Sequence, residues 1–340
     1  RCGLEKSGIG TPEALQVVAR AWRLGPRAAS FAGLKDRYGV TGQLVSVLRG
    51  PARNFDGRGF KLNYLGRADR PVGRGTILRN RFRLVLRDLR PSEADRLGAR
   101  ARDAAVHGVP DYYDDQRFGS LRGTGGRFVA EALLRGDHAA ALRLAIASPA
   151  RPDRSRLKKR RKMLQQRWGR WDDLARALEP SLEKRVCAHL AGGGTFAEAY
   201  GMISRPLRSL HLAAFQAHLL NECLRRAVPA GSPRHAGAAG PYVFFEGDPG
   251  ELKNRRIPLA SDEAPEDPLL DGVLRDAGLA RGGLPFRRGT RGAVVVPDDL
   301  RAGDPEDDEC NRGKVNVALS FALRPGSYAT MVVKRCTYDM

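Results

Sequence analysis

The sequence is poor in cysteine and contains no local cluster of metal-binding residues. Its five cysteines (Cys2, Cys187, Cys223, Cys310 and Cys336) lie far apart with no C-x-x-C pair, and its six histidines form no H-E-x-x-H motif. These spacings exclude a zinc site built from neighbouring ligands. Scattered thiols are typical of a reducing cytoplasm. We therefore expect a cytoplasmic protein with no metal and no small-molecule cofactor.

Long apolar runs are also missing. No stretch approaches the roughly 20 apolar residues that cross a bilayer, and nothing resembles a signal peptide. We therefore expect no membrane association. With 340 residues, of which 42% are hydrophobic and 29% charged, the chain can bury a substantial core over about two domains. Because the first residue is arginine rather than methionine, we expect a fragment or an incomplete start.

Acidic residues are scarce relative to basic ones. There are 59 Lys+Arg against 38 Asp+Glu, a net charge of +21, and only ten of the 59 are lysines. Arginine forms forked hydrogen bonds to phosphate and stacks on bases, so this excess indicates a nucleic-acid partner. A GC-rich codon bias also accounts for the Arg/Lys ratio, but it does not explain the sign of the charge.

Hydrophobic periodicity predicts strands, then helices, then strands. Thr11-Pro12-Glu13 reads as a helix start with Thr11 as the N-cap. The other predicted elements are strands at Ser30–Ala32, Leu44–Leu48, Phe60–Leu65 and Arg81–Leu89, helices from Phe128 to Val228, loops at 231–240 and 260–267, and strands at Val315–Leu323 and Ala329–Cys336. The long helix from Arg208 to Val228 would place Leu210, Ala214, Ala217, Leu220 and Leu224 on one side. This order favours an α+β domain split by a helical insertion.

A carboxylate between two cations stands out in the first strand region. Asp36 lies between Lys35 and Arg37, just after one predicted strand and before another. Flanking cations favour the ionised carboxylate and attract a polyanion, which suits a nucleophile that acts on nucleic acid. The alternative is an ordinary turn aspartate.

Two further segments combine aromatic and polar side chains. Asn80 and Phe82 point to the same side of a strand and could read and stack a nucleobase; alternatively, Phe82 is a core residue and Asn80 a turn residue. The segment 109–119 mixes tyrosine and phenylalanine with Arg117, a composition that contacts unpaired bases, although such a loop could equally plug a core. The segment from Arg151 to Arg170 carries ten Lys/Arg and one Asp. It is either an RNA contact or a solvated helix face.

Taken together, these segments resemble the TruD family of pseudouridine synthases. The resemblance is carried by five segments that follow one another in order: Gly33-Leu-Lys-Asp-Arg-Tyr-Gly-Val-Thr-Gly-Gln43, Asn80-Arg-Phe-Arg-Leu-Val-Leu-Arg87, Tyr112-Tyr-Asp-Asp-Gln-Arg-Phe-Gly119, the helix from Arg208 to Asn221, and Pro325-Gly-Ser-Tyr-Ala-Thr330.

The resemblance implies a mixed or antiparallel pseudouridine-synthase sheet core, in residues 1–120 and 291–340, interrupted by a largely helical, basic insertion at 121–290. It implies isomerisation of uridine to pseudouridine in tRNA, at position 13, by a protein we expect to be a monomer. Asp36 falls on the catalytic aspartate, and Asn80 and Phe82 fall on positions that contact the target uracil. We assign Lys35, Arg37 and Arg117 to substrate or phosphate contacts. Gln43 is expected at the substrate site, supporting the Asp36 loop.

One departure from the family pattern bears on activity. The family has a strand with a Phe-x-Val-x-Glu pattern before the first helix, and this pattern is not found ahead of Thr11. We therefore expect part of the core sheet to be missing. That leaves a non-catalytic RNA-binding or RNA-remodelling protein as the alternative, and a basic ribonucleoprotein component as a weaker one.

Overall fold

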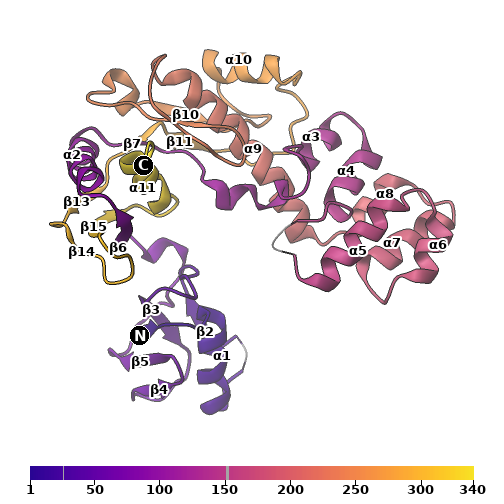
Figure 1. Ribbon diagram of the computed structural model, residues 1–340. Helices are drawn as coiled ribbons and strands as arrows, with labels where there is room; N and C mark the ends of the chain where they lie inside the picture. Colours follow the sequence, from indigo (N-terminus) through magenta and orange to yellow (C-terminus); the bar gives the residue numbers. More distant parts are fainter. Residues whose placement is uncertain (26, 151–152) are drawn as a thin grey trace. The chain divides into compact units, whose positions relative to one another are not determined.

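The chain divides into two compact units. The computed structural model describes residues 1–25, 27–150 and 153–340. Unit 1 comprises Arg1–Asn80 and unit 2 comprises Arg81–Met340 (Figure 1). The partition at residues 120 and 290 stays a prediction. Within the described ranges, no helix is both long and apolar enough to cross a membrane.

Unit 1 is an antiparallel sheet with a helix against one face (Figure 1). Its described strands follow the order β2-β3-β1-β5-β4. The elements are β1 (Cys2–Lys6), α1 (Thr11–Ala21), β2 (Ala29–Phe31), β3 (Thr41–Val47), β4 (Phe55–Gly57), β5 (Phe60–Tyr64) and η1 (Arg74–Thr76). Helix α1 buries Leu15 and Val18 in one cluster with Leu4 of the sheet. The three strands predicted in this region are confirmed, each to within three residues at either end.

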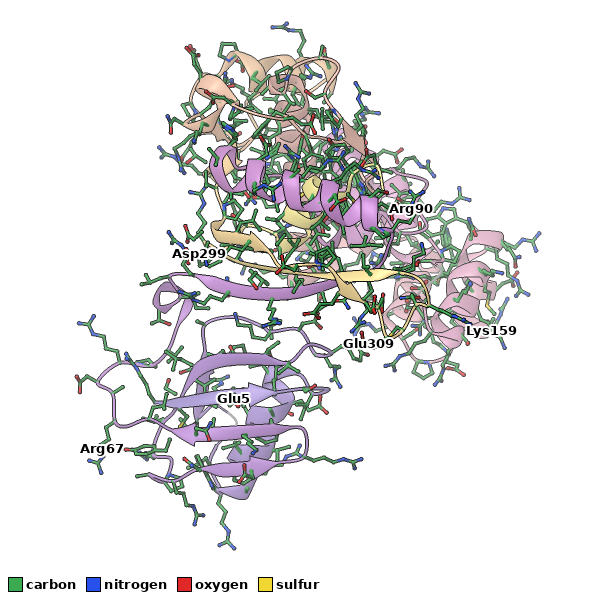
Figure 2. All side chains as sticks on the ribbon, turned by 60° about the vertical axis from the view of Figure 1, so that its left-hand side comes forward. Glu5, Arg67, Arg90, Lys159, Asp299 and Glu309 are labelled. Atoms are coloured by element: carbon green, nitrogen blue, oxygen red, sulfur yellow. The ribbon has the colours of Figure 1, made fainter. Side chains whose placement is uncertain are left out.

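A strand that the sequence analysis overlooked lies before the first helix, but it does not carry the Phe-x-Val-x-Glu pattern, so the absence of that family strand stays a prediction. Cys2–Lys6 forms β1, which lies in the middle of the sheet, as the position of Glu5 in Figure 2 shows. Leu4 pairs with Gln43 on one side and with Leu62 on the other. Its alternation was hidden because the third inward-facing position is a lysine, Lys6, which is only 3% exposed.

The start of α1 also differs from the prediction. Gly10, not Thr11, is the N-cap, and its N–H faces the Glu13 carboxylate at 3.5 Å. Thr11 is the first helical residue, and its side chain is fully buried. Its hydroxyl is therefore available to another part of unit 1.

The sheet of unit 2 joins distant parts of the chain. Strand β15 (Val315–Leu323) pairs with β13 (Asp298–Ala302), β14 (Glu306–Asp307) and β6 (Asn80–Leu89), the last of which begins in unit 1. Helices α2 (Pro91–His107) and α11 (Ala329–Thr337) pack with this sheet in one apolar cluster. The strand predicted at Val315–Leu323 is confirmed, and Val317, Leu319 and Phe321 are buried; Asn316 and Ala322 on the opposite side are buried as well, so both faces of the strand are partly covered.

The strand predicted at Ala329–Cys336 is wrong, because this segment is helix α11. Its buried residues are Met331, Val332, Arg335 and Cys336, a spacing that lines one face of a helix rather than one face of a strand. The β-branched Val332 and Val333 favour a strand locally. Packing against α2 and the sheet overrides that local preference.

Seven helices fill the described middle of unit 2, as predicted for 128–228 (Figure 1). They are α3 (Val129–Leu134), α4 (His138–Ile146), α5 (Ser155–Gln166), α6 (Trp171–Ala177), α7 (Leu182–Ala191), α8 (Phe196–Gly201) and α9 (Arg205–Ala227). We call α3–α8 the helical region; its apolar cluster draws on Leu142, Leu164 and Val186. On α9, Ala214, Ala217, Leu220 and Leu224 are buried, whereas Leu210, predicted on the same side of the helix, is 56% exposed.

Short elements complete unit 2 around α9. They are β7 (Val109–Pro110), η2 (Asp115–Leu121), β8 (Arg234–His235), β9 (Tyr242–Val243), η3 (Gly250–Lys253), β10 (Arg256–Pro258), α10 (Pro268–Asp276), β11 (Thr290–Gly292) and β12 (Val294–Val295). The predicted loop 231–240 thus contains β8, whereas 260–267 is a loop as predicted. Antiparallel sheets together with a helical region confirm the α+β class.

Two histidines in α9 make the stability of unit 2 depend on pH. The His211 ring lies 2.9 Å from the Tyr200 hydroxyl, and the His218 ring packs 4.7 Å from Phe128. Burial lowers the pKa of each to about 4. In the unfolded chain the pKa of histidine is about 6.5. Between pH of about 4 and about 6.5 the unfolded chain therefore binds more protons than the folded chain.

We therefore expect the free energy of unfolding to be unaffected by these groups above pH of about 6.5 and to fall as the pH drops toward about 4. Chemical denaturation at a series of pH values measures this. The variant with His211→Gln and His218→Gln should show a flatter dependence over the same range. An unchanged slope in that variant would contradict the assignment.

Candidate active site

Asp36 lies in the loop between β2 and β3, with its side chain exposed. The Tyr38 N–H donates a hydrogen bond to Asp36 Oδ1 at 3.1 Å, which closes a tight turn beneath the carboxylate. Asp36 Oδ2 has no hydrogen-bond partner in the described part of the chain. One carboxylate oxygen is thus held, and the other is free to meet a ligand.

The backbone of this loop is anchored by side chains from β1 and α1. Lys6 donates from its ammonium to the Asp36 carbonyl oxygen at 2.5 Å. Arg37 pairs with Glu13 of α1 at 2.6 Å, with both side chains about half exposed. Because loop carbonyls lack the partners that a sheet provides, such side-chain bonds set the position of the loop.

Charges of both signs act on Lys6 beneath the loop. Burial lowers the pKa of Lys6, the negative charge of Asp36 raises it, and the positive charge of Arg37 lowers it. Lys6 therefore contributes a cation on the buried side of the loop, in addition to Lys35 and Arg37 within it. This places Asp36 in a cationic environment that the flanking sequence shows only in part.

A buried hydroxyl connects α1 to both ends of the loop. Gln43 of β3 donates its amide to Thr11 Oγ1 at 2.7 Å, and the Lys35 N–H donates to the same oxygen at 3.4 Å. Gln43 therefore lies behind the loop, consistent with the supporting role expected of it. Thr11 was interpreted only as a helix cap; its burial, which no local pattern reports, explains why its second role was missed.

Lys35 links Asp36 to Asn80. The Lys35 ammonium donates to Asn80 Oδ1 at 2.6 Å, and burial lowers the Lys35 pKa. An ammonium has only hydrogens to offer, so the Asn80 atom facing it is the oxygen and the amide NH2 points elsewhere. Unit 1 thus brings together three of the predicted residues: Lys35, Asp36 and Asn80.

Phe82 and Arg117 belong to unit 2. The centroid of the half-buried Phe82 ring lies 5.4 Å from that of Phe321, within the apolar cluster around the sheet. At least part of the Phe82 side chain is therefore a core contact, as the alternative interpretation proposes. Arg117, on η2, lies with its guanidinium 5.1 Å from the Tyr113 ring.

The aromatic residues beside Arg117 are mostly core residues. Tyr112 is fully buried and its hydroxyl donates to the Val243 carbonyl at 3.2 Å; Phe118 is 1% exposed. Tyr112 and Phe118 are therefore core residues, as the alternative interpretation of this loop proposes. Tyr113 is only partly buried and packs against that core.

Two networks of ion pairs and hydrogen bonds connect Asp111 and Asp114 to residues 291–334 in the C-terminal part of the chain. Asp114 accepts hydrogen bonds from Lys334 at 2.6 Å and from Thr330 at 2.8 Å. Arg291 bonds both the Asp111 carboxylate at 2.8 Å and the Gly326 carbonyl at 3.0 Å. Sequence reasoning missed these roles, because the partners lie some 180 to 220 positions apart.

No described His, Cys, Asp and Glu residues gather in a group that could hold a metal ion. The groups that converge on the Asp36 loop are instead ammonium, hydroxyl, amide and carboxylate. Together they present one exposed carboxylate oxygen and one amide NH2 from a rigid part of unit 1. This set can act on a polar ring by proton transfer, nucleophilic attack and hydrogen bonding.

The buried Thr11 hydroxyl should contribute measurably to stability. Thr11→Val removes the acceptor and leaves the partly buried Gln43 amide unpaired beside the buried position 11, which costs about 1–3 kcal/mol in free energy of unfolding. Thr11→Ser retains the hydroxyl and should lose much less. Denaturant titration of both variants provides the measurement. Equal stabilities for the Val and Ser variants would show that the hydrogen bonds contribute nothing.

Comparison with known proteins gives one consistent family. The sequence profile of TruD, described as tRNA pseudouridine synthase D, matches residues 1–269. A relative from Methanococcus maripaludis is 27% identical over 98% of this chain and 91% of its own length. The tRNA pseudouridine synthase D of Leptospira interrogans is 26% identical over 98% of this chain and 88% of its own.

A solved structure has the same fold. A crystal structure of a TruD protein from Methanosarcina mazei matches 99% of this chain and 87% of its own chain, with a TM-score of 0.76 at 21% identity. This confirms the predicted fold class. With the profile matching well over half of the chain, the protein belongs to the TruD family of tRNA pseudouridine synthases, which are isomerases.

Proposed function

We propose that this protein isomerises uridine to pseudouridine at position 13 of tRNA, with Asp36 as the catalytic carboxylate. The observation that carries the proposal is an exposed carboxylate whose backbone is held rigidly by Lys6 and whose neighbour Lys35 is bonded to Asn80. Membership of the TruD family supports the reaction, and the position in tRNA follows from the resemblance alone.

The reaction breaks the N1–C1′ bond, turns the uracil and joins C5 to C1′, while the hydrogen of C5 is replaced by one on N1. Atoms and electrons balance without an oxidant, a reductant or net hydrolysis. Asp36 Oδ2 is the free oxygen that would attack C1′ or C6, or take a proton from the sugar to give a glycal. All three routes need water to be kept from C1′.

Asn80 is suited to hold the uracil edge. Because its Oδ1 accepts from Lys35, its NH2 is left to donate to a carbonyl oxygen of the base. Extruding the target base from its stack costs a few kcal/mol. Stacking of the base on the exposed part of the Phe82 ring would offset part of this cost. Lys35 would then position Asn80 rather than contact phosphate. Arg37 is about half exposed, so its guanidinium can still contact the phosphate backbone of the RNA.

The basic run in the helical region supplies candidates for phosphate contacts. Arg151 lies outside the described residues. Within α5, Arg156, Arg160 and Arg161 pair with Glu179, Glu183 and Asp153. Lys158, Lys159 and Lys162 have no ion pair in the described part of the chain, and Lys159 lies on the exposed surface (Figure 2). We assign the tRNA contact of this helix to these three lysines.

The alternative function is RNA binding or remodelling without catalysis, and a ribonucleoprotein component remains a weaker one. Both use the basic surface alone, and neither requires the arrangement of Asp36, Lys35 and Asn80. A monomer in the cytoplasm stays our expectation for either function.

Replacing the carboxylate tests catalysis directly. Asp36→Asn should reduce pseudouridine formation to background while tRNA affinity stays within a few-fold, because the side chain keeps its size and loses only its charge. Nucleoside analysis of tRNA after incubation gives the product, and mapping along the strand gives its position. Asp56→Asn, at an exposed position of β4, is the matched control and should retain activity. Full activity of Asp36→Asn would eliminate the proposed catalyst.

Salt dependence tests the phosphate contacts. Affinity should fall steeply as salt rises, because each neutralised phosphate releases counterions. Removing Lys158, Lys159 and Lys162 together by alanine substitution should make the slope of log affinity against log salt shallower by about one for each lysine that contacts phosphate. A binding isotherm series in rising KCl provides the data. A slope unchanged by the triple substitution would exclude this helix from the interface.

A further inference from the structure

The helical region contains a hollow with the features of a nucleotide site. Its volume is about 380 Å³, and its wall is formed by the loop after η2, by α4 and by the end of α5. The side chains that give it chemical character are Arg127, Asp137, Arg143, Gln165 and Trp168. None of these residues was singled out by sequence reasoning, and all of them belong to unit 2, whereas Asp36 belongs to unit 1.

Trp168 presents a fixed aromatic surface to this hollow. Its ring meets Trp171 edge-on, with ring centroids 4.9 Å apart at 80°, and Trp171 in turn meets Phe196 at 6.0 Å. These contacts hold the indole in place while the residue stays only partly buried. A rigid, partly uncovered indole is a good stacking platform for a nucleobase.

Two arginines beside the indole are free to bind an anion. Arg143 on α4 is exposed, with its guanidinium 5.8 Å from the Trp168 ring centroid. Arg127 is exposed and donates only from Nε to the Thr124 carbonyl, at 3.4 Å. Neither forms an ion pair with a carboxylate among the described residues, in contrast to the paired arginines of α5.

Asp137 is the acidic side chain of the hollow. Its Oδ1 caps α4 by accepting from the Ala140 N–H at 2.8 Å. The hollow is lined by two guanidinium groups, those of Arg127 and Arg143, and by this one carboxylate, so the net charge of its lining is positive. Gln165, which is exposed, adds an amide that can both donate to and accept from a base edge.

The backbone of the wall is closely fitted. Gly123 adopts φ +80°, and a Cβ at this position would lie 2.3 Å from the Pro149 carbonyl oxygen. Only glycine permits this approach. The loop that carries Arg127 is therefore packed directly against the segment that follows α4, and this close approach forms part of the wall of the hollow.

Two further hollows adjoin this one through shared lining residues, as they would in a site that follows a polymer. A neighbouring hollow of about 350 Å³ shares Arg127 and Asp137 with it, and another of about 430 Å³ shares Leu144 and Ser148. The latter is lined by Arg117 and Arg122. The predicted substrate contact of Arg117 would then belong to this groove.

The geometry points to a binding pocket on α4 for one unpaired nucleotide of the RNA substrate, with its base stacked on Trp168 and its phosphate held by Arg127 and Arg143. The identity of the ligand rests on the proposed function, because that function makes RNA the substrate. The pocket acts in recognition: it holds a nucleotide other than the uridine at Asp36, so that a tRNA lacking an unpaired base at that place binds less tightly.

Tryptophan fluorescence tests the stacking in the full-length protein. The sequence contains three tryptophans: Trp22, Trp168 and Trp171. Unmodified tRNA transcript, added to the Asp36→Asn protein so that no turnover occurs, should quench the emission. Trp168→Phe in the same background should lose most of the quenching while its ring keeps the core packed. Trp22→Phe, in unit 1, is the matched control and should keep it.

Charge removal gives an independent measurement. The Arg127→Ala/Arg143→Ala variant should bind tRNA about tenfold or more weakly. The control Arg176→Ala/Arg185→Ala removes the same charge from exposed positions on α6 and α7 and should change affinity by less than about threefold. Uridine monophosphate should compete only at concentrations far above those of the tRNA. Saturation by the mononucleotide without competition from tRNA would overturn the proposal in favour of a free-nucleotide site.

The outcomes for the two proposals are distinguishable. Equal quenching by tRNA in Trp168→Phe, or equal loss of affinity in the two arginine variants, would overturn the pocket even if pseudouridine forms normally. Conversely, specific quenching at Trp168 in a protein that forms no pseudouridine on any tRNA would overturn the proposed catalysis and leave the pocket intact.

Discussion

The candidate active site depends on one buried ammonium group, that of Lys6. A catalytic carboxylate must be exposed to reach a substrate, yet it must not move freely. The loop that carries Asp36 has no strand partner of its own, so its position comes from Lys6 bonding the Asp36 carbonyl, from Thr11 bonding Lys35 and Gln43, and from Glu13 pairing with Arg37. A central strand and a helix start, both in unit 1, together hold the loop.

Unit 2 uses its charges differently. Lys334 forms an ion pair with Asp114, and Arg291 forms one with Asp111. These two pairs join residues 111–114 to the C-terminal part of the chain. Many of the cations that give the protein its net charge of +21 are paired in this way. The total charge favours a nucleic-acid partner, and the cations without an ion pair among the described residues, such as Lys159 and Arg143, are the ones that we propose contact it.

The fold was predictable where one periodicity dominated. The alternation in Val315–Leu323 and the helical pattern from 128 to 228 both correspond to observed elements. Prediction failed where local preference and tertiary packing disagree. The β-branched segment of α11 becomes a helix because its buried side chains meet α2 and the sheet, and β1 was overlooked because Lys6 occupies an inward-facing position. Leu210 lies on the side of α9 that its spacing predicts, yet it is exposed, because the apolar side of the helix is not covered along its whole length.

The sequence by itself was enough to indicate the family and to single out Asp36, Lys35 and Asn80 as candidates, because these are properties of short segments. Only the tertiary structure decided how those segments are held. The bond from Lys35 to Asn80, the buried hydroxyl of Thr11 and the hollow beside Trp168 each join residues whose separation along the chain carries no periodic signal. Such contacts exist only after the strands have paired and the helices have packed, so no local pattern could have revealed them.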